Sequence, residues 1–411
     1  MKRSATTTAG FLLAVLPLLV KPPFGYSQQP VASFLYDERG RVVRQEQDTN
    51  GDGKMDRWTY YNTQGQIERV EQDMNFDGKP DVTVYYESER PSRQEVASKN
   101  DGQIDTWYYL NAKGEVERKG QDPKRSGKAT LWVIYENGLP VRSEEDTKVT
   151  GRANRTVFFK NGKISRVDED TKGGGKPDTF SYFENDQLVR KEMDRKGVGK
   201  IDLWGFYQNG ALVRQDEDLR GDGKVSRIVY FQGDEVLRRD EDTGGRGRMD
   251  MIELFAQSQL TKRLRDTKAS GKWDIIYYFK ENEMVREERD TNGDGIFDVR
   301  IFYDKGQIIA QEADTNGDRR VDVWINFQNG EQVEQLEDQN YQGKITARYL
   351  FKSGQVIDQQ QVANGEPPRA SGQFAAVEEE VKYMTAYGGS GSLSNRASLG
   401  LIPVESGSQM K

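Results

Sequence analysis

The segment Asp48-Thr-Asn-Gly-Asp-Gly-Lys-Met-Asp56, followed directly by Arg57-Trp-Thr-Tyr-Tyr61, decides the fold of this chain. The first part is a polar loop, and the second is an aromatic and β-branched run that favours a β-strand. A short turn and a second strand-like run, Ile67-Glu-Arg-Val-Glu71, complete the unit before the next loop begins at Asp73. Because this order recurs, we interpret the chain as one repeat array and not as several separate domains.

The first loop residue, which we call position 1, recurs every 24 residues, with 25 at two early steps. A constant period of this kind indicates that each repeat is one supersecondary unit stacked on its neighbours. The registers are Asp48, Asp73, Ala97, Asp122, Asp146, Asp170, Asp194, Asp218, Asp242, Asp266, Asp290, Asp314 and Asp338.

The short turns decide the topology of the unit. Asn-Gly pairs at Asn137-Gly138, Asn161-Gly162, Asn209-Gly210 and Asn329-Gly330 separate two strand-like runs. Asn-Gly supports positive φ at both central residues, which a type I′ hairpin turn requires. A parallel β-helix is the alternative, but it stacks like charges one strand spacing apart. We therefore predict an all-β fold, an elongated or curled antiparallel β-meander of about thirteen 24-residue hairpin repeats.

Two side-chain patterns run through the predicted strands. Position 14 is aromatic in most repeats, and position 11, on the opposite strand face, holds Trp58, Trp107, Trp132, Trp204 and Trp324. Aromatic residues on both faces predict a sheet that curls or is covered. In most repeats an Arg lies four residues before position 1 and an acid two residues before it, as in Arg44 and Glu46. We interpret these charges as a structural ladder, with a charged groove for a polar polymer as the alternative.

The two ends of the chain differ from the array. Residues 1–27 have a basic start, a short apolar run and small residues before Gln28, which predicts a secretory signal peptide. The hairpin array is expected over residues 32–362, and residues 363–411 form a flexible C-terminal tail. We expect the chain to be exported to the periplasm, the outer cell surface or the medium, with no transmembrane segment after signal removal.

Composition restricts the chemistry. The chain has no Cys and no His, which excludes disulfides, thiolate or imidazole metal sites and the triads built on Cys or His. Its net charge is −7, and the two signs are interspersed along the sequence, so no basic stripe indicates nucleic acid. Carboxylate chemistry and hard cations that prefer oxygen ligands remain.

Four loops keep the pattern Asp-x-Asn-x-Asp with a further Asp at position 9, which places oxygen ligands at alternate positions of a tight turn. This is the first half of an EF-hand-like loop, but position 12 lacks the bidentate Glu. We therefore predict weak calcium binding, with Kd on the order of 10⁻⁴ to 10⁻³ M. A metal-free Asx turn is the alternative. The predicted ligands are Asp48, Asn50, Asp52, Asp56, Asp73, Asn75, Asp77, Asp81, Asp290, Asn292, Asp294, Asp298, Asp314, Asn316, Asp318 and Asp322.

The central loops depart from this pattern because position 3 becomes Lys or Arg, as at Lys172 between Asp170 and Asp178. One hypothesis is that the ammonium group replaces the metal between the two carboxylates. The other is a solvated lysine in a degenerate loop.

Two families resemble this chain. Tyr36-Asp-Glu-Arg-Gly-Arg-Val-Val43 resembles the Tyr-Asp repeat of bacterial RHS proteins, whose hairpins curl into shells. Phe158-Phe-Lys-Asn-Gly-Lys-Ile164 and Phe206-Tyr-Gln-Asn-Gly-Ala-Leu212 are similar to MORN-type hairpins, which form elongated twisted sheets. The resemblance implies hairpin repeats over residues 34–362.

The functional prediction is a non-catalytic exported repeat protein that acts as a structural or binding scaffold, with calcium-binding turns in some repeats. The alternative is a polysaccharide-binding surface protein whose Trp series stacks on sugar rings. No repeat shows a distinctive extra set of residues, so we do not expect an enzyme. The expected partner is a protein or a polysaccharide, and not nucleic acid.

Overall fold

The computed structural model describes residues 31–368, and its 28 strands form a single antiparallel meander sheet. This confirms the predicted fold class. The sheet is not closed, since among the described strands β1 pairs with β2 and β28 with β27 alone. The predicted signal peptide, residues 1–27, and most of the predicted tail lie outside the described residues.

The strand bounds follow the repeat closely, with the first strand of most hairpins five or six residues long and the second six or seven. They are β1 Val31–Tyr36, β2 Val42–Asp48, β3 Arg57–Tyr61, β4 Ile67–Gln72, β5 Val82–Glu87, β6 Arg90–Val96, β7 Thr106–Leu110, β8 Val116–Gln121, β9 Leu131–Glu136, β10 Leu139–Glu145, β11 Arg155–Lys160, β12 Lys163–Glu169, β13 Thr179–Glu184, β14 Gln187–Met193, β15 Leu203–Gln208, β16 Ala211–Glu217, β17 Arg227–Gln232, β18 Glu235–Glu241, β19 Met251–Ala256, β20 Gln259–Arg265, β21 Ile275–Lys280, β22 Glu283–Arg289, β23 Val299–Asp304, β24 Gln307–Ala313, β25 Val323–Gln328, β26 Glu331–Glu337, β27 Ile345–Lys352 and β28 Gln355–Gly365.

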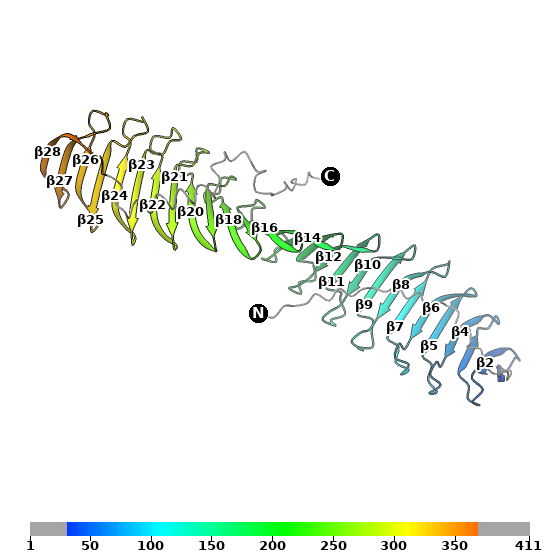
Figure 1. The fold of residues 1–411 in the computed structure, drawn as a ribbon. Helices are drawn as coiled ribbons and strands as arrows, with labels where there is room; N and C mark the ends of the chain where they lie inside the picture. The colour runs from blue at the N-terminus through cyan, green and yellow to red at the C-terminus, as the bar shows by residue number, and fades with distance from the viewer. Residues whose placement is uncertain (1–30, 369–411) are drawn as a thin grey trace. The chain divides into compact units, whose positions relative to one another are not determined.

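The chain divides into two compact units, and the boundary between Pro140 and Val141 falls within β10. In each unit the short hairpin turns follow one edge of the sheet and the long Asp-containing loops follow the other (Figure 1). The repeat explains this arrangement, because every hairpin returns the chain to the same edge. All long loops of a unit therefore lie side by side along one edge of its sheet (Figure 1).

The Asn-Gly turns have the predicted backbone geometry. Asn161 and Gly162 have φ of 53° and 75°, and Asn329 and Gly330 have φ of 54° and 81°. Positive φ at both central residues is what a type I′ turn needs. Some turns reach the same geometry without glycine, such as Asn185-Asp186 with φ of 50° and 64°. The predicted hairpin turns are thus confirmed.

One face of the sheet carries the predicted charge ladder. Arg69 pairs with Glu71 at 2.8 Å, and the Tyr60 hydroxyl donates to the same carboxylate at 3.0 Å. The Arg69 guanidinium also lies over the Tyr60 ring, 3.6 Å from its centroid. The same arrangement recurs downstream, where Arg190 pairs with Glu192 at 2.7 Å. In these hairpins the ladder therefore joins the second strand to the first, through Tyr60 and Tyr182.

The apolar core of this protein is thin. The described residues contain no helix and no second sheet, so of the two predicted arrangements, a sheet that curls or a sheet that is covered, covering does not occur within residues 31–368. An apolar cluster forms where Leu264, Val285 and Phe297 pack against Ile276 and Tyr278. Elsewhere, single buried residues such as Val157 line the middle of the strands. Hydrogen bonds and ion pairs therefore accompany a small apolar core in this sheet.

Candidate functional site: the aspartate loops

The position 1 aspartate organises every long loop except the third, where position 1 is Ala97. In the first loop the Asp48 carboxylate accepts the main-chain N–H of Gly51 at 2.6 Å and of Gly53 at 2.8 Å. Asp218 accepts the corresponding amides of Gly221 at 2.6 Å and Gly223 at 2.7 Å. One carboxylate thus closes the turn by satisfying two amides that have no strand partner.

The position 9 residue closes the other side of the loop. Asp56 accepts the main-chain N–H of Thr49 at 2.9 Å and its hydroxyl at 2.8 Å. Where position 9 is Asn154, its side-chain oxygen accepts the amide of Thr147 at 2.7 Å. Main-chain bonds join successive loops too, since the N–H of Asp73 donates to the carbonyl of Asp56 at 2.8 Å. Positions 1 and 9 are therefore the fixed structural elements of the loop.

The hydrogen bonds of the loops lower the pKa of several of these acids. Burial acts to raise the pKa of Asp218, but the main-chain amides of Gly223 and Gly221 outweigh it and hold the pKa below its usual value. Burial acts in the same direction on Asp178, and there the Thr171 hydroxyl and the Lys172 amide outweigh it. These carboxylates are therefore ionised near neutral pH and unsuited to act as general acids.

The structure separates the sixteen predicted calcium ligands into two groups. Those at positions 1 and 9 are buried against main-chain amides, except that Asp314 is half-buried. Those at positions 3 and 5 are exposed, and they bond to each other, as where the Asn292 amide donates to Asp294 at 3.1 Å. Asp52 and Asp77 form the same contact with Asn50 and Asn75.

These ligand sets fit a bound metal only in part. Each carboxylate oxygen has two lone pairs, so an oxygen that accepts one N–H keeps one pair for a cation. However, residues 31–368 contain no group of three or more acidic side chains placed to hold a metal ion. The Asx-turn alternative accounts for the loop hydrogen bonds without a metal, and calcium binding stays a prediction.

The internal-cation hypothesis is wrong for Lys172. Its ammonium group lies 2.6 Å from the carbonyl oxygen of Asp194, in the following loop, and not between Asp170 and Asp178. Lys268 repeats this contact, 3.1 Å from the carbonyl of Asp290. At Lys172 and Lys268 the position 3 cation therefore connects adjacent loops. Sequence reasoning missed this because it placed the lysine only within its own loop.

Glycines at the loop tips leave room for these cations. A Cβ on Gly197 would lie 3.5 Å from the Lys172 Nζ, and one on Gly175 would lie 2.7 Å from a guanidinium nitrogen of Arg152. Both glycines have positive φ, so the turn geometry favours glycine as well. Arg152 belongs to a second basic series, at position 7, which the sequence analysis did not single out. Its 24-residue recurrence is visible in the sequence.

A buried acid interrupts the sheet face opposite the ladder. Glu253, at position 12, is 1% exposed and accepts hydrogen bonds from Arg239 at 2.7 Å and Arg263 at 2.8 Å. The equivalent residues Val133 and Val229 are apolar. The expectation that no repeat carries a distinctive set of residues is therefore wrong here. Comparing position 12 between repeats would have revealed it.

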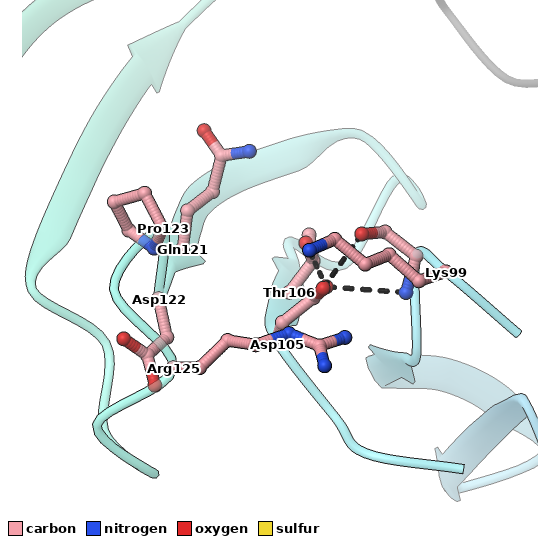
Figure 2. A pocket seen from close by; sticks show the side chains of 8 residues that line it. Lys99, Asp105, Thr106, Gln121, Asp122, Pro123 and Arg125 are labelled. Atoms are coloured by element: carbon pink, nitrogen blue, oxygen red, sulfur yellow. Dashed lines mark hydrogen bonds between the residues drawn. The ribbon is translucent and has the colours of Figure 1, made fainter. Parts of the chain in front are cut away.

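A shallow hollow of about 140 Å³ lies between two successive loops in the first unit (Figure 2). Asp105 and Asp122 line it together with Lys99 and Arg125. Asp105 accepts the Ser98 hydroxyl at 2.6 Å, and Asp122 accepts the Gly127 amide at 2.6 Å. Both acids thus hold their own loops, and the hollow is the gap that separates them.

The tryptophans of position 11 are placed differently from one another. Trp324 is buried, whereas Trp58, Trp107 and Trp204 are half-buried. The ring of the half-buried Trp132 lies below the Arg118 guanidinium, whose carbon is 3.7 Å from the ring centroid. A Cβ on Gly120 would lie 2.7 Å from the same ring. At Trp132 the ring therefore packs within the sheet.

Fold and loops together define a class, a β-hairpin repeat protein with aspartate-closed loops along one edge of its sheet. The sequence matches no family model and no curated protein. Residues 31–368 contain no helix long and apolar enough to span a membrane.

Among solved structures, the chain is similar to the TcdB2–TccC3–Cdc42 complex at 11% identity and a TM-score of 0.14, covering 77% of this chain and 24% of that one. The TcdB2–TccC3 complex gives 11% identity and a TM-score of 0.14, covering 80% and 25%. Accessory secretory proteins 1, 2 and 3 of Streptococcus pneumoniae give 14% identity and a TM-score of 0.20, covering 23% and 18%. The chain thus spans a quarter or less of the length of these chains, and such low TM-scores carry no functional argument.

Proposed function

We propose that this protein is a non-catalytic, exported scaffold whose long sheet edge presents a regular series of loops. The observation that carries the proposal is the repeated closure of the loops by buried acids. The position 6 amide donates to position 1 in all twelve loops that have Asp there, from Asp48 to Asp338. A loop whose amides are already satisfied keeps its conformation without a ligand, which is what a scaffold requires.

Hydrogen exchange tests the scaffold proposal. In a preformed array, the loop amides at positions 4 and 6, such as those of Gly221 and Gly223, are protected in the free protein. Exchange at the rate of an unfolded peptide throughout the loops would contradict the proposal. Export is tested separately by the N-terminus of the mature protein, which we expect at Gln28.

The proposal includes calcium-binding turns in the four loops that keep the Asp and Asn ligands. What supports it is the ligand pattern and the exposure of positions 3 and 5, for example Asn292 and Asp294, to solvent cations. The resemblance to RHS-type and MORN-type repeats belongs to the same proposal, and the hairpin units support it.

Polysaccharide binding through the Trp series is a second candidate. The half-buried rings of Trp58, Trp107 and Trp204 support it, because a partly exposed ring can stack on a sugar. Quenching of Trp fluorescence by a glycan, lost on substitution of these residues by Leu, is the test. Unchanged fluorescence across neutral and acidic glycans would remove this candidate.

A further inference from the structure

The loop edge of the second unit has an uneven charge distribution. Positions 2 to 8 of its first six loops hold thirteen basic residues and one acid, Asp222. The basic residues are Lys148, Arg152, Lys172, Lys176, Arg195, Lys196, Lys200, Arg220, Lys224, Arg246, Arg248, Lys268 and Lys272. The next loop along, residues 291–297, holds one acid and no basic residue. We call these six basic loops the basic strip.

Burial of the loop acids separates the two signs of charge. Asp146, Asp170, Asp194, Asp218 and their equivalents are buried and accept main-chain amides, whereas most of the lysines lie at the exposed loop tips. The interspersed charges of the sequence thus become a basic outer row above an acidic inner row. The expectation that no basic stripe exists is wrong at this edge.

Six of the thirteen basic side chains of the strip already bind other groups of the protein. Lys172, Lys196 and Lys268 bind carbonyls of the next loop, and Arg248 pairs with Asp266 at 2.6 Å. Seven further side chains are exposed and make no side-chain hydrogen bond or ion pair with any described residue. These seven are Lys148, Arg152, Lys176, Lys200, Lys224, Arg246 and Lys272. They are free to bind a partner.

The free cations follow the repeat, with one interruption in the fifth loop, where the position 7 residue Arg248 pairs with Asp266. Five of them, Arg152, Lys176, Lys200, Lys224 and Lys272, occupy position 7 of their loops. Successive loops lie two strands apart, which places equivalent side chains about 9 to 10 Å from each other. A row of cations on successive loops matches an extended polymer with repeated anionic groups better than a compact small anion.

The side chains between the cations indicate the class of polymer. In the six loops, positions 2 to 8 contain one aromatic residue, Trp273, and otherwise small or aliphatic residues among the charges. Single-stranded nucleic acids are held by aromatic stacking platforms as well as by cations. A row of cations without such platforms favours a polymer without bases.

We propose that the basic strip binds an extended anionic polysaccharide, with position 7 cations of successive loops contacting successive acidic groups. This inference deepens the scaffold proposal and rests on it, because the row exists only while the loops are held in place. It assigns binding to the loop edge, whereas the tryptophan candidate assigns it to a sheet face.

The test measures binding of the full mature chain to sodium polygalacturonate in EDTA, with neutral dextran as the comparison. A strip variant carries Lys176→Gln, Lys200→Gln, Lys224→Gln and Lys272→Gln. A matched variant removes four exposed lysines near the opposite edge of the same unit, Lys160→Gln, Lys163→Gln, Lys305→Gln and Lys352→Gln. We expect binding at about 50 mM salt to weaken about tenfold or more in the strip variant alone, with a shallower dependence on salt.

Three outcomes would overturn the proposal. They are wild-type affinity in the strip variant, an equal loss in both variants, or no binding of polygalacturonate by the wild type. Tighter binding of a single-stranded or duplex DNA oligonucleotide than of polygalacturonate would assign the strip to nucleic acid instead. Circular dichroism of each variant reports the scaffold separately, so a folded variant that fails to bind tests the strip and not the sheet.

Discussion

The ammonium group of Lys172 lies 2.6 Å from the carbonyl oxygen of Asp194, a residue that begins the next loop. This contact crosses from one repeat to another and is additional to the strand pairing. Arg220 makes the equivalent contact with the carbonyl of Asp242. Five successive loops of the second unit, those that begin at residues 170 to 266, are therefore each coupled through a basic side chain to the next loop.

Substituting Lys172→Met should loosen this coupling without unfolding the sheet. The carbonyl of Asp194 loses a charged donor, and the following loop gains freedom. We expect faster hydrogen exchange at Gly197 and Gly199, measured by NMR, with a small change in global stability of below about 1 kcal/mol. Exchange at Gly221, one loop further, serves as the internal control. Unchanged exchange at Gly197 would contradict the coupling.

Substituting Asp218→Ala should destabilise the protein much more than Asp222→Ala in the same loop. Asp218 is 2% exposed and accepts two main-chain amides, which would be left without partners. We expect a loss of about 2 kcal/mol in the free energy of unfolding, measured by urea denaturation. Asp222 is exposed, so its loss should have little effect. Equal effects would show that position 1 does not close the loop.

Acid should weaken the array below a defined pH. Loop hydrogen bonds hold the pKa of Asp146, Asp194, Asp218 and Asp242 below the usual value of 3.8. A group whose folded pKa lies below its unfolded pKa contributes stability above the unfolded value, and this is lost as pH falls through the folded value. The urea concentration at the midpoint of unfolding should therefore stay level from about pH 6 to 4. It should decrease as the pH is lowered further, below the ordinary Asp pKa of 3.8. A midpoint that rises with acid would contradict this.

Burial raises the pKa of Asp216 despite its pairing with Arg214, so this acid acts in the opposite direction. Asp216→Asn should shift the acid transition only slightly, since a single ladder residue opposes many loop residues. It is the control variant for the acid experiment.

Calcium should raise the thermal midpoint if the four ligand-bearing loops bind it. We expect a rise at millimolar calcium that EDTA reverses and that Asp294→Asn together with Asp52→Asn reduces, because both residues are exposed ligands at position 5. Asp222, in a loop with Arg220 at position 3, supplies the control substitution Asp222→Asn. Identical thermal midpoints in calcium and in EDTA would contradict calcium binding and favour the metal-free Asx turn.

Replacing the buried acid of the opposite face tests whether it stabilises the sheet. Glu253→Val introduces the residue found at the equivalent Val229, but it leaves Arg239 and Arg263 without their acid. We expect a loss of about 2 kcal/mol, because the two guanidinium groups then repel each other on a half-buried face. Adding Arg239→Gln and Arg263→Gln should restore most of the stability. A stable single variant would show that the cluster is dispensable.

Sequence patterns predicted the hairpins well because the signals are local. The Asn161-Gly162 turn, the strand alternation and the pairing of Arg69 with Glu71 depend on residues close together in one or two strands. The 24-residue repeat then reproduces the same turn and strand pattern along the chain. This is why the fold class follows from a single repeat.

The loop edge was harder to predict, because its properties arise between repeats. The direction of Lys172 depends on how far the next loop lies from it, and no pattern within one loop gives that distance. Likewise, the separation of charge requires knowing that Asp218 is buried while Lys224 is exposed. Comparison of the repeats by position would have revealed the basic residues at position 7 and the departure at Glu253, although not their contacts.

The order of strand pairing has a consequence for how such a protein can change in length. Each strand from β2 to β27 pairs with the strands before and after it in sequence, so a duplicated 24-residue unit would place each new strand beside the same kinds of strand as the original. Gain or loss of a whole hairpin would keep all long loops on one edge of the sheet and all short turns on the other. Insertion of a single strand would place the later long loops on the edge that carries the turns. Genetic variation in whole units is thus the change that this architecture tolerates, and it would lengthen or shorten the basic strip one loop at a time.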